Sequence, residues 1–253
     1  MGKPLKHQRR GKGSPRYVAP SSRFHVDLKY RNYDDIEKTG MLRGEVQRFL
    51  DDPGRESLLM LVRYDNDESG YLLAPEGIAI GDSIEVGSQG KITNGGVLPL
   101  YRIPDGAPIF NVEKRPGDGG KFVKSPGLYA TLVSKEGKTV RIRLPSKQVI
   151  TLSNECRAQI GMIAGGGKTE RPLVKAGTAF FKYKARNRLW PKVRGVAQSV
   201  YTHPHGGRQH HEGRPTTVKR GSPPGKKVGH VAARSTGRKK TKIEESKLEE
   251  GNA

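Results

Sequence analysis

The feature that most constrains this chain is the concentration of positive charge in its C-terminal third. Residues 171–242 hold 19 Lys and Arg residues and one acidic residue, Glu212, whereas the whole chain has a formal net charge of +22. Residues 191–242 are also rich in Gly, Pro and His. Such a segment cannot recover its ordering entropy by burying a core, so we expect it to stay extended until a partner orders it.

The remaining charge divides the chain into a near-neutral middle and a second, shorter basic arm. Residues 1–40 hold 10 basic and 4 acidic residues, residues 41–115 hold 8 and 12, and residues 116–170 hold 9 and 4. The last eleven residues hold one Lys and four Glu. Most of the Leu, Ile and Val residues lie in the middle, where a core can form. A field this positive predicts a nucleic-acid partner. A solvated tail is the alternative, which mutual repulsion of the charges disfavours.

Composition and the N-terminus exclude several classes of protein. The longest aliphatic run, Leu58–Val62, is far shorter than the roughly 20 residues of a membrane helix. One cysteine cannot form an internal disulfide. Residues 1–13 are basic but no apolar stretch follows them, unlike a signal peptide. We therefore expect a soluble, cytoplasmic protein with one or two small domains and extended arms.

The middle of the chain predicts short β-strands separated by turns. Apolar runs at 44–50, 57–64, 71–74 and 83–86 alternate with segments rich in Asp, Asn, Gly and Pro. Several short strands at this spacing indicate a small barrel or sandwich. Carboxylates of this region fall mainly in the predicted turns, where solvation explains them.

A second β unit begins near residue 100, and its strongest element is a hairpin formed by 128–133 and 139–144. In its second strand Val140, Ile142 and Leu144 alternate with Arg141 and Arg143, so one face is apolar and the other basic. The basic face is either simply solvated or turned toward phosphates. A further strand is expected at 148–152, and a short helix within 173–189, which Pro172 and Pro191 bound.

Two glycine-rich segments invite a phosphate-loop interpretation. Residues 161–169 end in Gly-Lys-Thr, but position 162, where the first glycine of that motif belongs, is Met, and no apolar strand is expected before it. Residues 115–121 also lack the spacing. A loop close to an RNA backbone fits the first segment better, and the second is either such a loop or a plain connector.

Four histidines lie within nine residues, at His203, His205, His210 and His211. Imidazoles at such spacing could bind zinc, but Cys156 is far away in sequence and is the only thiol. Stacking on, or hydrogen bonding to, unpaired RNA bases is the alternative. We expect Cys156 to act as a small buried hydrophobe, and we find no constellation for nucleophilic catalysis.

Several segments then carry a family resemblance. They are His25-Val-Asp-Leu-Lys-Tyr-Arg, Leu73-Ala-Pro-Glu-Gly-Ile, Ile103-Pro-Asp-Gly, Asn111-Val-Glu, Arg115-Pro-Gly-Asp-Gly-Gly-Lys, Ser125-Pro-Gly-Leu-Tyr-Ala, Arg143-Leu-Pro-Ser, Glu155-Cys-Arg-Ala, Lys175-Ala-Gly, Trp190-Pro-Lys-Val-Arg-Gly-Val-Ala and Thr202-His-Pro-His-Gly-Gly. Because these segments follow one another in this order, the chain resembles the second universal protein family of the large ribosomal subunit. Gln209-His210-His211-Glu212-Gly213 resembles its archaeal and eukaryotic branch, while residues 243–253 match no element of the family.

The resemblance implies a mainly β fold, in which an OB-like barrel precedes an SH3-like barrel and long basic arms extend into rRNA. We place the N-terminal extension at 1–38, the OB-like barrel at 39–99, the SH3-like barrel at 100–172 and the C-terminal arm with its acidic end at 173–253. The implied function is non-enzymatic. The chain would bind and brace large-subunit rRNA near the peptidyl-transferase centre, supporting assembly, tRNA placement and translation. A non-ribosomal RNA chaperone is the alternative.

The expected partners are large-subunit rRNA and neighbouring ribosomal proteins, with no membrane and no small-molecule substrate. No cofactor or protein-bound metal is expected, apart from Mg²⁺ that accompanies bound rRNA. The candidate RNA-binding residues are Arg9, Arg10, Lys12, Arg16, Arg23, Lys121, Lys124, Arg141, Arg143, Lys168, Lys175, Lys182, Lys184, Arg186, Arg188, Trp190, Lys192, Arg194, His203, His205, Arg208, His210, Arg214, Lys219, Arg220, Lys226, Lys227, Arg234, Arg238, Lys239 and Lys240. Their cations would neutralise phosphates and release counterions, which makes binding depend strongly on salt.

Overall fold

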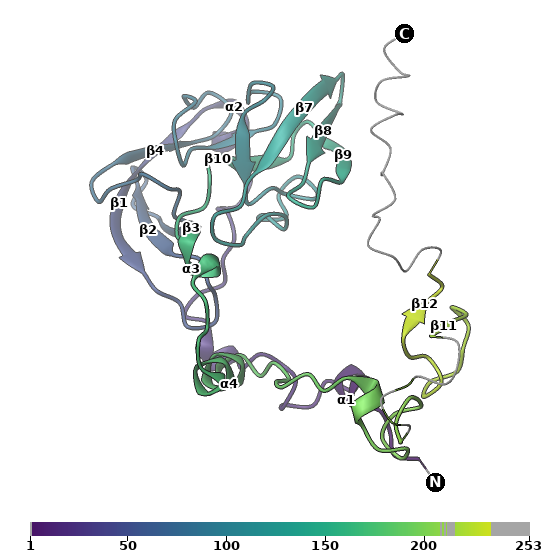
Figure 1. Ribbon diagram of the computed structural model, residues 1–253. Helices are drawn as coiled ribbons and strands as arrows, with labels where there is room; N and C mark the ends of the chain where they lie inside the picture. Colours follow the sequence, from purple (N-terminus) through teal and green to yellow (C-terminus); the bar gives the residue numbers. More distant parts are fainter. Residues whose placement is uncertain (1, 208, 210, 212–215, 234–253) are drawn as a thin grey trace. The chain divides into compact units, whose positions relative to one another are not determined.

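The chain divides into two compact units (Figure 1). The computed structural model describes residues 2–207, 209, 211 and 216–233, except for the Thr169 side chain. Residues Ser21–Pro172 form one unit, called here the β unit, and Met1–Pro20 with Leu173–Ala253 form the other, called the arm unit. Each unit is described by itself.

The described chain is mainly β, as predicted. The strands are β1 (Leu42–Leu50), β2 (Leu59–Tyr64), β3 (Ser69–Leu73), β4 (Ser83–Val86), β5 (Val97–Pro99), β6 (Pro108–Phe110), β7 (Ala130–Glu136), β8 (Thr139–Arg143), β9 (Val149–Ser153), β10 (Arg157–Ile160), β11 (Thr217–Val218) and β12 (His230–Val231). The helices are α1 (Lys6–Gly11), α2 (Asp35–Thr39), α3 (Gly167–Glu170) and α4 (Ala176–Ala185), with 3-10 turns η1 (Ser21–Arg23) and η2 (Gly195–Ala197).

The strands of the β unit form one ten-stranded sheet in the order β3-β2-β1-β4-β5-β10-β6-β7-β8-β9. Figure 1 shows β1 and β2 at one end of this unit and β7, β8 and β9 at the other. The last strand in sequence, β10, completes the sheet in its middle because it pairs antiparallel with both β5 and β6. The four early strands, the hairpin and the strand near 150 overlap the ranges predicted from the sequence.

Two main hydrophobic clusters fill the β unit. Side chains at alternate positions of β1, such as Leu42 and Val46, join those of β2–β4 in the first cluster. The second cluster contains Val140 and Ile142 of β8 with side chains of β5–β7 and β10, and it also includes the buried Cys156 just before β10. The period-two alternation of β8 is therefore confirmed, with Arg141 half-buried and Arg143 exposed.

The arm unit buries few side chains, as its composition predicts. Among its described residues, the buried side chains are Leu5, Ala179, His205 and Val228. Its longest helix is α4, and β11 and β12 form a two-stranded parallel pair. The sequence did not predict α1 in this unit or α2 in the β unit. Asp34 caps α2 by accepting a hydrogen bond from the Glu37 backbone N–H at 3.2 Å.

Candidate nucleic-acid interface

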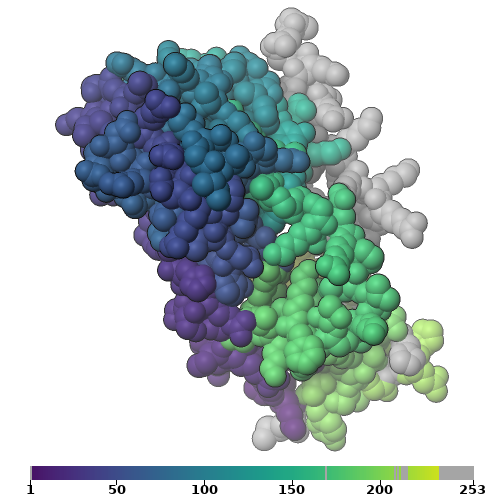
Figure 2. Space-filling view, turned by 90° about the vertical axis from the view of Figure 1, so that its left-hand side faces the viewer, coloured from purple at the N-terminus to yellow at the C-terminus, as the bar shows by residue number. Residues whose placement is uncertain are grey.

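The N-terminal segment packs against residues of the C-terminal arm in the arm unit, which the sequence did not predict. The Lys3 backbone N–H donates to the Tyr201 carbonyl at 2.8 Å. The Asn187 side-chain amide donates to the carbonyls of Pro15 and Val18 at 3.0 and 2.9 Å. Figure 2 shows N-terminal residues (purple) against residues of the C-terminal arm (green). The basic residues of both arms are therefore presented by one body.

Most of the predicted cations of the arm unit are exposed. Those that the structure describes as exposed are Arg9, Arg10, Lys12, Arg16, Lys175, Lys182, Lys184, Arg188, Lys192, Arg194, Lys219, Arg220 and Lys226. Arg186, Trp190, His203 and Lys227 are half-buried, and His205 is buried. Arg208, His210, Arg214, Arg234, Arg238, Lys239 and Lys240 lie outside the described residues.

Helix α4 combines exposed cations with exposed rings. Phe181 is 68% exposed, and its ring meets Phe180 edge to face at 5.4 Å between centroids. Lys184 Nζ lies 5.8 Å from the Phe180 ring centroid, a cation–π distance. The ring of Tyr183, in the last turn of the helix, lies nearly parallel to that of Trp190 just beyond it, with 6.1 Å between centroids. Such a surface offers both phosphate contacts and stacking planes.

The predicted cations of the β unit have more intramolecular contacts. Lys121 and Arg143 are exposed, but Lys121 Nζ lies 3.4 Å from an Asp118 carboxylate oxygen. Arg141 is paired with Glu136 at 3.1 Å, so part of its charge is already compensated. The remaining three candidates in this unit are Arg23, Lys124 and Lys168, of which the first two are half-buried and the third is exposed.

Lys124 and Lys168 donate to backbone carbonyls of the β unit. Lys124 Nζ lies 3.5 Å from the Leu28 carbonyl oxygen, and Lys168 Nζ lies 3.4 Å from that of Glu56. Burial lowers the pKa of Lys124, and the nearby charge of Lys121 adds to the shift. These lysines therefore also help to hold loops of the β unit in place.

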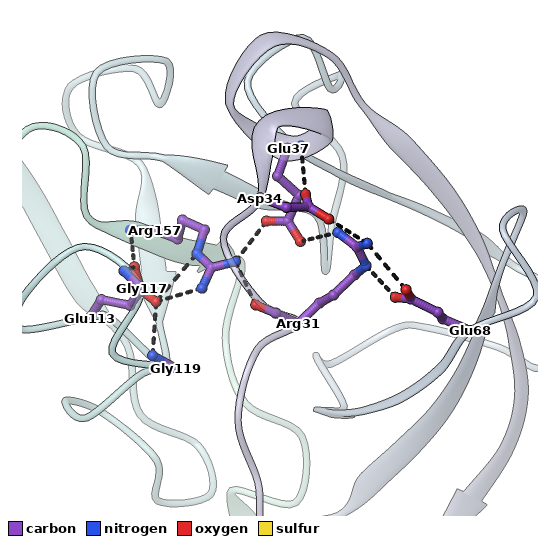
Figure 3. Close-up of polar contacts among 8 residues, drawn as sticks. All are labelled: Arg31, Asp34, Glu37, Glu68, Glu113, Gly117, Gly119 and Arg157. Carbon is purple, nitrogen blue, oxygen red and sulfur yellow. Dashed lines mark hydrogen bonds and ion pairs between the residues drawn. The ribbon is translucent and has the colours of Figure 1, made fainter.

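A buried ion-pair network in the β unit was not predicted from the sequence (Figure 3). At its centre is Arg157 of β10, whose side chain is 1% exposed. Arg157 Nη1 lies 2.6 Å from Glu37 Oε2 and donates to the Arg31 carbonyl at 2.9 Å, while Nη2 lies 2.8 Å from Glu113 Oε1. One guanidinium thus connects β10 to the segment before β1 and to the loop after β6.

Aromatic rings surround the same guanidinium. The Arg157 guanidinium carbon lies 5.2 Å from the Tyr30 ring centroid and 4.8 Å from that of Tyr33. Tyr30 Oη donates to the Asn111 carbonyl at 2.6 Å, and burial raises the pKa of Tyr30 well above its usual value. Burial also raises the pKa of Glu37, an effect that the Arg157 charge opposes. The cation and its carboxylates are therefore shielded from water and satisfied mainly by one another.

The glycine-rich loop at 115–121 folds around a carboxylate of its own chain. The backbone N–H groups of Gly117 and Gly119 donate to Glu113 at 3.3 and 2.9 Å, and that of Arg157 donates to it at 2.9 Å. Gly119 has a φ of +79°, a conformation that favours glycine. These donors are thus used inside the protein, and this loop is more than a plain connector.

Arg31 extends the network toward the surface. It pairs with Asp34 at 2.6 Å, with Glu37 at 3.6 Å and with Glu68 through a short contact. Hydrogen bonding to Arg31 lowers the pKa of Asp34 and of Glu68. The neighbouring guanidiniums of Arg31 and Arg157 are thus held together by the carboxylates around them, with Glu37 shared between the two.

Two carboxylates of the middle region are buried. The expectation that solvation in turns explains the carboxylates of this region was therefore wrong for these two. Asp52 is fully buried, pairs with Arg55 and accepts from the Gly54 N–H at 3.1 Å. Glu113 is fully buried in the network. Both lie among backbone donors and a guanidinium, which replace the water that a carboxylate needs.

The segment at 161–169 is not built as a phosphate loop. Strand β10 does lead into it, contrary to our expectation, but the helix that follows, α3, has four residues. The N–H of Gly161 donates to the Pro108 carbonyl at 2.9 Å and that of Ala164 to the Ala74 carbonyl at 3.0 Å. Backbone donors that a phosphate would need are therefore engaged by the β unit itself.

His203 and His205 lie against each other in a tight turn. Their rings are 5.0 Å apart, and the His205 N–H donates to His203 Nδ1 at 3.1 Å. Burial, with smaller contributions from His205 and His7, lowers the pKa of His203. Among the described residues no group of three or more His, Cys, Asp or Glu side chains could hold a metal ion.

A mainly β body joined to arms with exposed cations and rings is typical of proteins that bind nucleic acid. The family described as Ribosomal Proteins L2, RNA binding N-terminal domain, matches residues 5–86, and the one described as Ribosomal Proteins L2, C-terminal domain, matches residues 93–228. The chain belongs to the ribosomal protein L2 family, which confirms the resemblance seen in the sequence.

Archaeal relatives are similar to this chain over nearly its whole length. The large ribosomal subunit protein uL2 of Methanopyrus kandleri is 48% identical over 239 residues, which cover 94% of this chain and 98% of the relative. The protein of the same name from Methanocaldococcus jannaschii is 47% identical over 242 residues, covering 95% and 100%. That from Methanococcus maripaludis strain C6 is 49% identical over 241 residues, covering 94% and 100%. No helix in the described part of the chain is long and apolar enough to cross a membrane.

Proposed function

We propose that this chain is a non-catalytic component of the large ribosomal subunit that binds and braces large-subunit rRNA. The observation that carries the proposal is the coverage of the relatives: proteins named as large-subunit components align with 94–95% of the chain. A shared domain alone would align with a part of it. Here both the β unit and the arms fall within the alignment.

The two units suggest a division of work. The β unit has a closed core and a buried ion-pair network, so it can act as a rigid anchor on the rRNA surface. The arm unit offers exposed Lys and Arg beside rings such as Phe181, so it supplies phosphate contacts and stacking. Each phosphate contact releases condensed counterions and adds to the salt dependence of binding.

A position near the peptidyl-transferase centre is the finer part of the proposal, and it rests on the family resemblance of the His203–His205 turn. In that position the turn would shape and brace RNA that supports tRNA placement. Neighbouring ribosomal proteins would complete the contacts of the chain. A catalytic role for the two imidazoles is not part of the proposal.

Quantitative sedimentation of a cell lysate in magnesium tests the proposal. We expect the protein to run with the large subunit at about one copy per particle and to remain there after a moderate salt wash. A protein found mostly in the light fractions would contradict the proposal and would favour the RNA chaperone, which shares the charge but not the stoichiometry.

A further inference from the structure

The arm unit contains a cavity of about 530 Å³, called here the histidine cavity. His203, His205 and His230 contribute to its lining, together with Val196 and Thr216. Its wall combines the His203–His205 turn, the 3-10 turn η2 and the start of the β11–β12 pair, where the His230 N–H donates to the Thr216 carbonyl at 2.8 Å. Its volume lies within the range of about 300–1,000 Å³ that is usual for small-molecule sites.

Two glycines allow the rings to lie directly against backbone. A Cβ on Gly195 would come within 2.3 Å of His203 Cε1. A Cβ on Gly229, which has a φ of +73°, would come within 2.2 Å of the Thr216 carbonyl oxygen and 3.5 Å of His205 Cε1. The cavity walls therefore depend on the absence of side chains at these two positions, as in other sites of close backbone approach.

The charge of the lining differs from that of the surrounding arm. Among the described residues that line the cavity, Arg194 is the one Lys or Arg, whereas the exposed surface of the arm is rich in both. Burial lowers the pKa of His203, which favours its uncharged form. A phosphate would be better served by the exposed cations outside. Imidazole rings suit a planar heterocycle, on which they can stack and to which they can hydrogen-bond.

We infer that the histidine cavity receives an unpaired nucleobase of the bound RNA. The inference rests on the proposed function, because it takes RNA as the partner, and it adds a base-holding site to the phosphate contacts of the arm. Arg194 at this site can contact the phosphate or the base edge of the same nucleotide. The backbone of that nucleotide would continue over the exposed cations of the arm.

The test compares base reactivity in complexes of the full chain with large-subunit rRNA of the same organism. Dimethyl sulfate, kethoxal and a carbodiimide together modify the pairing edges of all four unpaired bases. We expect the wild-type chain to protect at least one unpaired base that His230→Ala and Gly195→Ala leave reactive. His230 is exposed, so its removal leaves the fold intact, whereas the methyl group that Gly195→Ala adds would push the His203 ring from its place. Loss of one base stack corresponds to roughly 5- to 150-fold weaker retention of that base.

Each variant has a matched control in the same unit. His211→Ala removes another exposed imidazole of the arm, one that does not line the cavity, and Gly221→Ala adds a methyl where no atom lies within 4 Å. Both controls should keep the protection. The inference is overturned if His230→Ala and Gly195→Ala protect the same bases as the wild type, or if the controls lose protection equally. A wild-type chain that binds no rRNA contradicts the proposed function itself.

Discussion

Arginine has different roles in the two units of this molecule. In the β unit, Arg157 is 1% exposed and ends on two buried carboxylates. In the arm unit, Arg188 and Arg194 are exposed, in a segment that has one acidic residue among 19 basic ones. The first kind of charge is satisfied within the fold and adds little to the outward field. The second kind is available to a polyanion. What separates them is the supply of nearby carboxylates, which is rich in the β unit and limited to Glu212 within residues 171–242.

Breaking the buried network should have the largest effect. Replacing Arg157 by Met leaves Glu113 buried without its cation and Glu37 with only the more distant Arg31, which should lower the free energy of unfolding by about 3–5 kcal/mol. Denaturant unfolding of the full chain, followed through the β unit's tyrosines, measures it. Arg143→Met is the control because Arg143 is exposed, and it should change stability by no more than about 0.5 kcal/mol. A loss below about 1 kcal/mol for Arg157→Met would show that the network does not hold the unit together.

Removing arm cations should weaken RNA binding while leaving stability unchanged. Changing Lys182, Lys184, Arg188 and Lys192 to Gln removes four exposed charges. At about 0.7–0.9 per phosphate contact, the slope of log K against log salt should fall by about 3. Over a threefold rise in salt, that difference corresponds to about a 20- to 50-fold change in affinity.

The matched control for the arm variant changes four exposed lysines of the β unit to Gln. These are Lys91, Lys114, Lys138 and Lys147. If the arm carries most phosphate contacts, this set should leave the slope nearly as it is. Equal losses from both sets would remove the distinction between anchor and arm. Binding to large-subunit rRNA over a salt titration, with melting curves of each variant, separates the outcomes.

The closed interior of the β unit should also be visible in the chemistry of its single thiol. Cys156 is fully buried, and burial raises its pKa to about 11 from 9.0. The neutral thiol is therefore favoured in the folded state. The stability that this group contributes is fully present below about pH 9 and is lost between about pH 9 and 11. At pH 10 about 1.4 kcal/mol of it has been lost.

Comparing Cys156→Ala with the wild type isolates that contribution. The difference in unfolding free energy between the two should change by about 1.4 kcal/mol between pH 7 and pH 10. Alkylation of the native thiol should be slow, and fast once the chain is unfolded. A native thiol that reacts as fast as an unfolded one would mean that the interior opens readily.

The sequence predicted those strands that show period-two alternation and that pair with neighbours in sequence. β8 is the clearest example, because Val140 and Ile142 are buried and Arg143 is exposed. β10 shows the limit. Its residues Arg157, Ala158, Gln159 and Ile160 are all buried, although the same pattern is typical of a half-exposed strand. Gln159 donates to the carbonyl oxygens of Leu73 and Gly95 at 3.3 and 3.4 Å. Both acceptors are distant from Gln159 in sequence.

The candidate interface was likewise predicted only in part. The exposed arm cations were predicted because residues 171–242 offer them only one carboxylate, Glu212. The contact between the N-terminal segment and the C-terminal arm was not, because it rests on backbone groups such as the Tyr201 carbonyl that carry no sequence signature. The network around Arg157 was missed for a third reason. Its carboxylates at Glu37 and Glu113 look like ordinary polar residues until the fold places them beside the guanidinium.

The same contrast between a compensated and an exposed arginine occurs on a smaller scale within one strand, β8. Arg141 and Arg143 share the basic face of β8, but Arg141 is paired with Glu136 at 3.1 Å. If both face phosphates, Arg143→Ala should lower the salt slope by about 0.7–0.9, which is a two- to threefold effect over a threefold rise in salt. Arg141→Ala should lower it less, because its partner already compensates part of its charge. Glu136→Gln should raise the slope, since it frees Arg141. Unchanged rRNA binding by the Arg141→Ala/Arg143→Ala double variant across the titration would assign this face to solvent and leave phosphate binding to the arm.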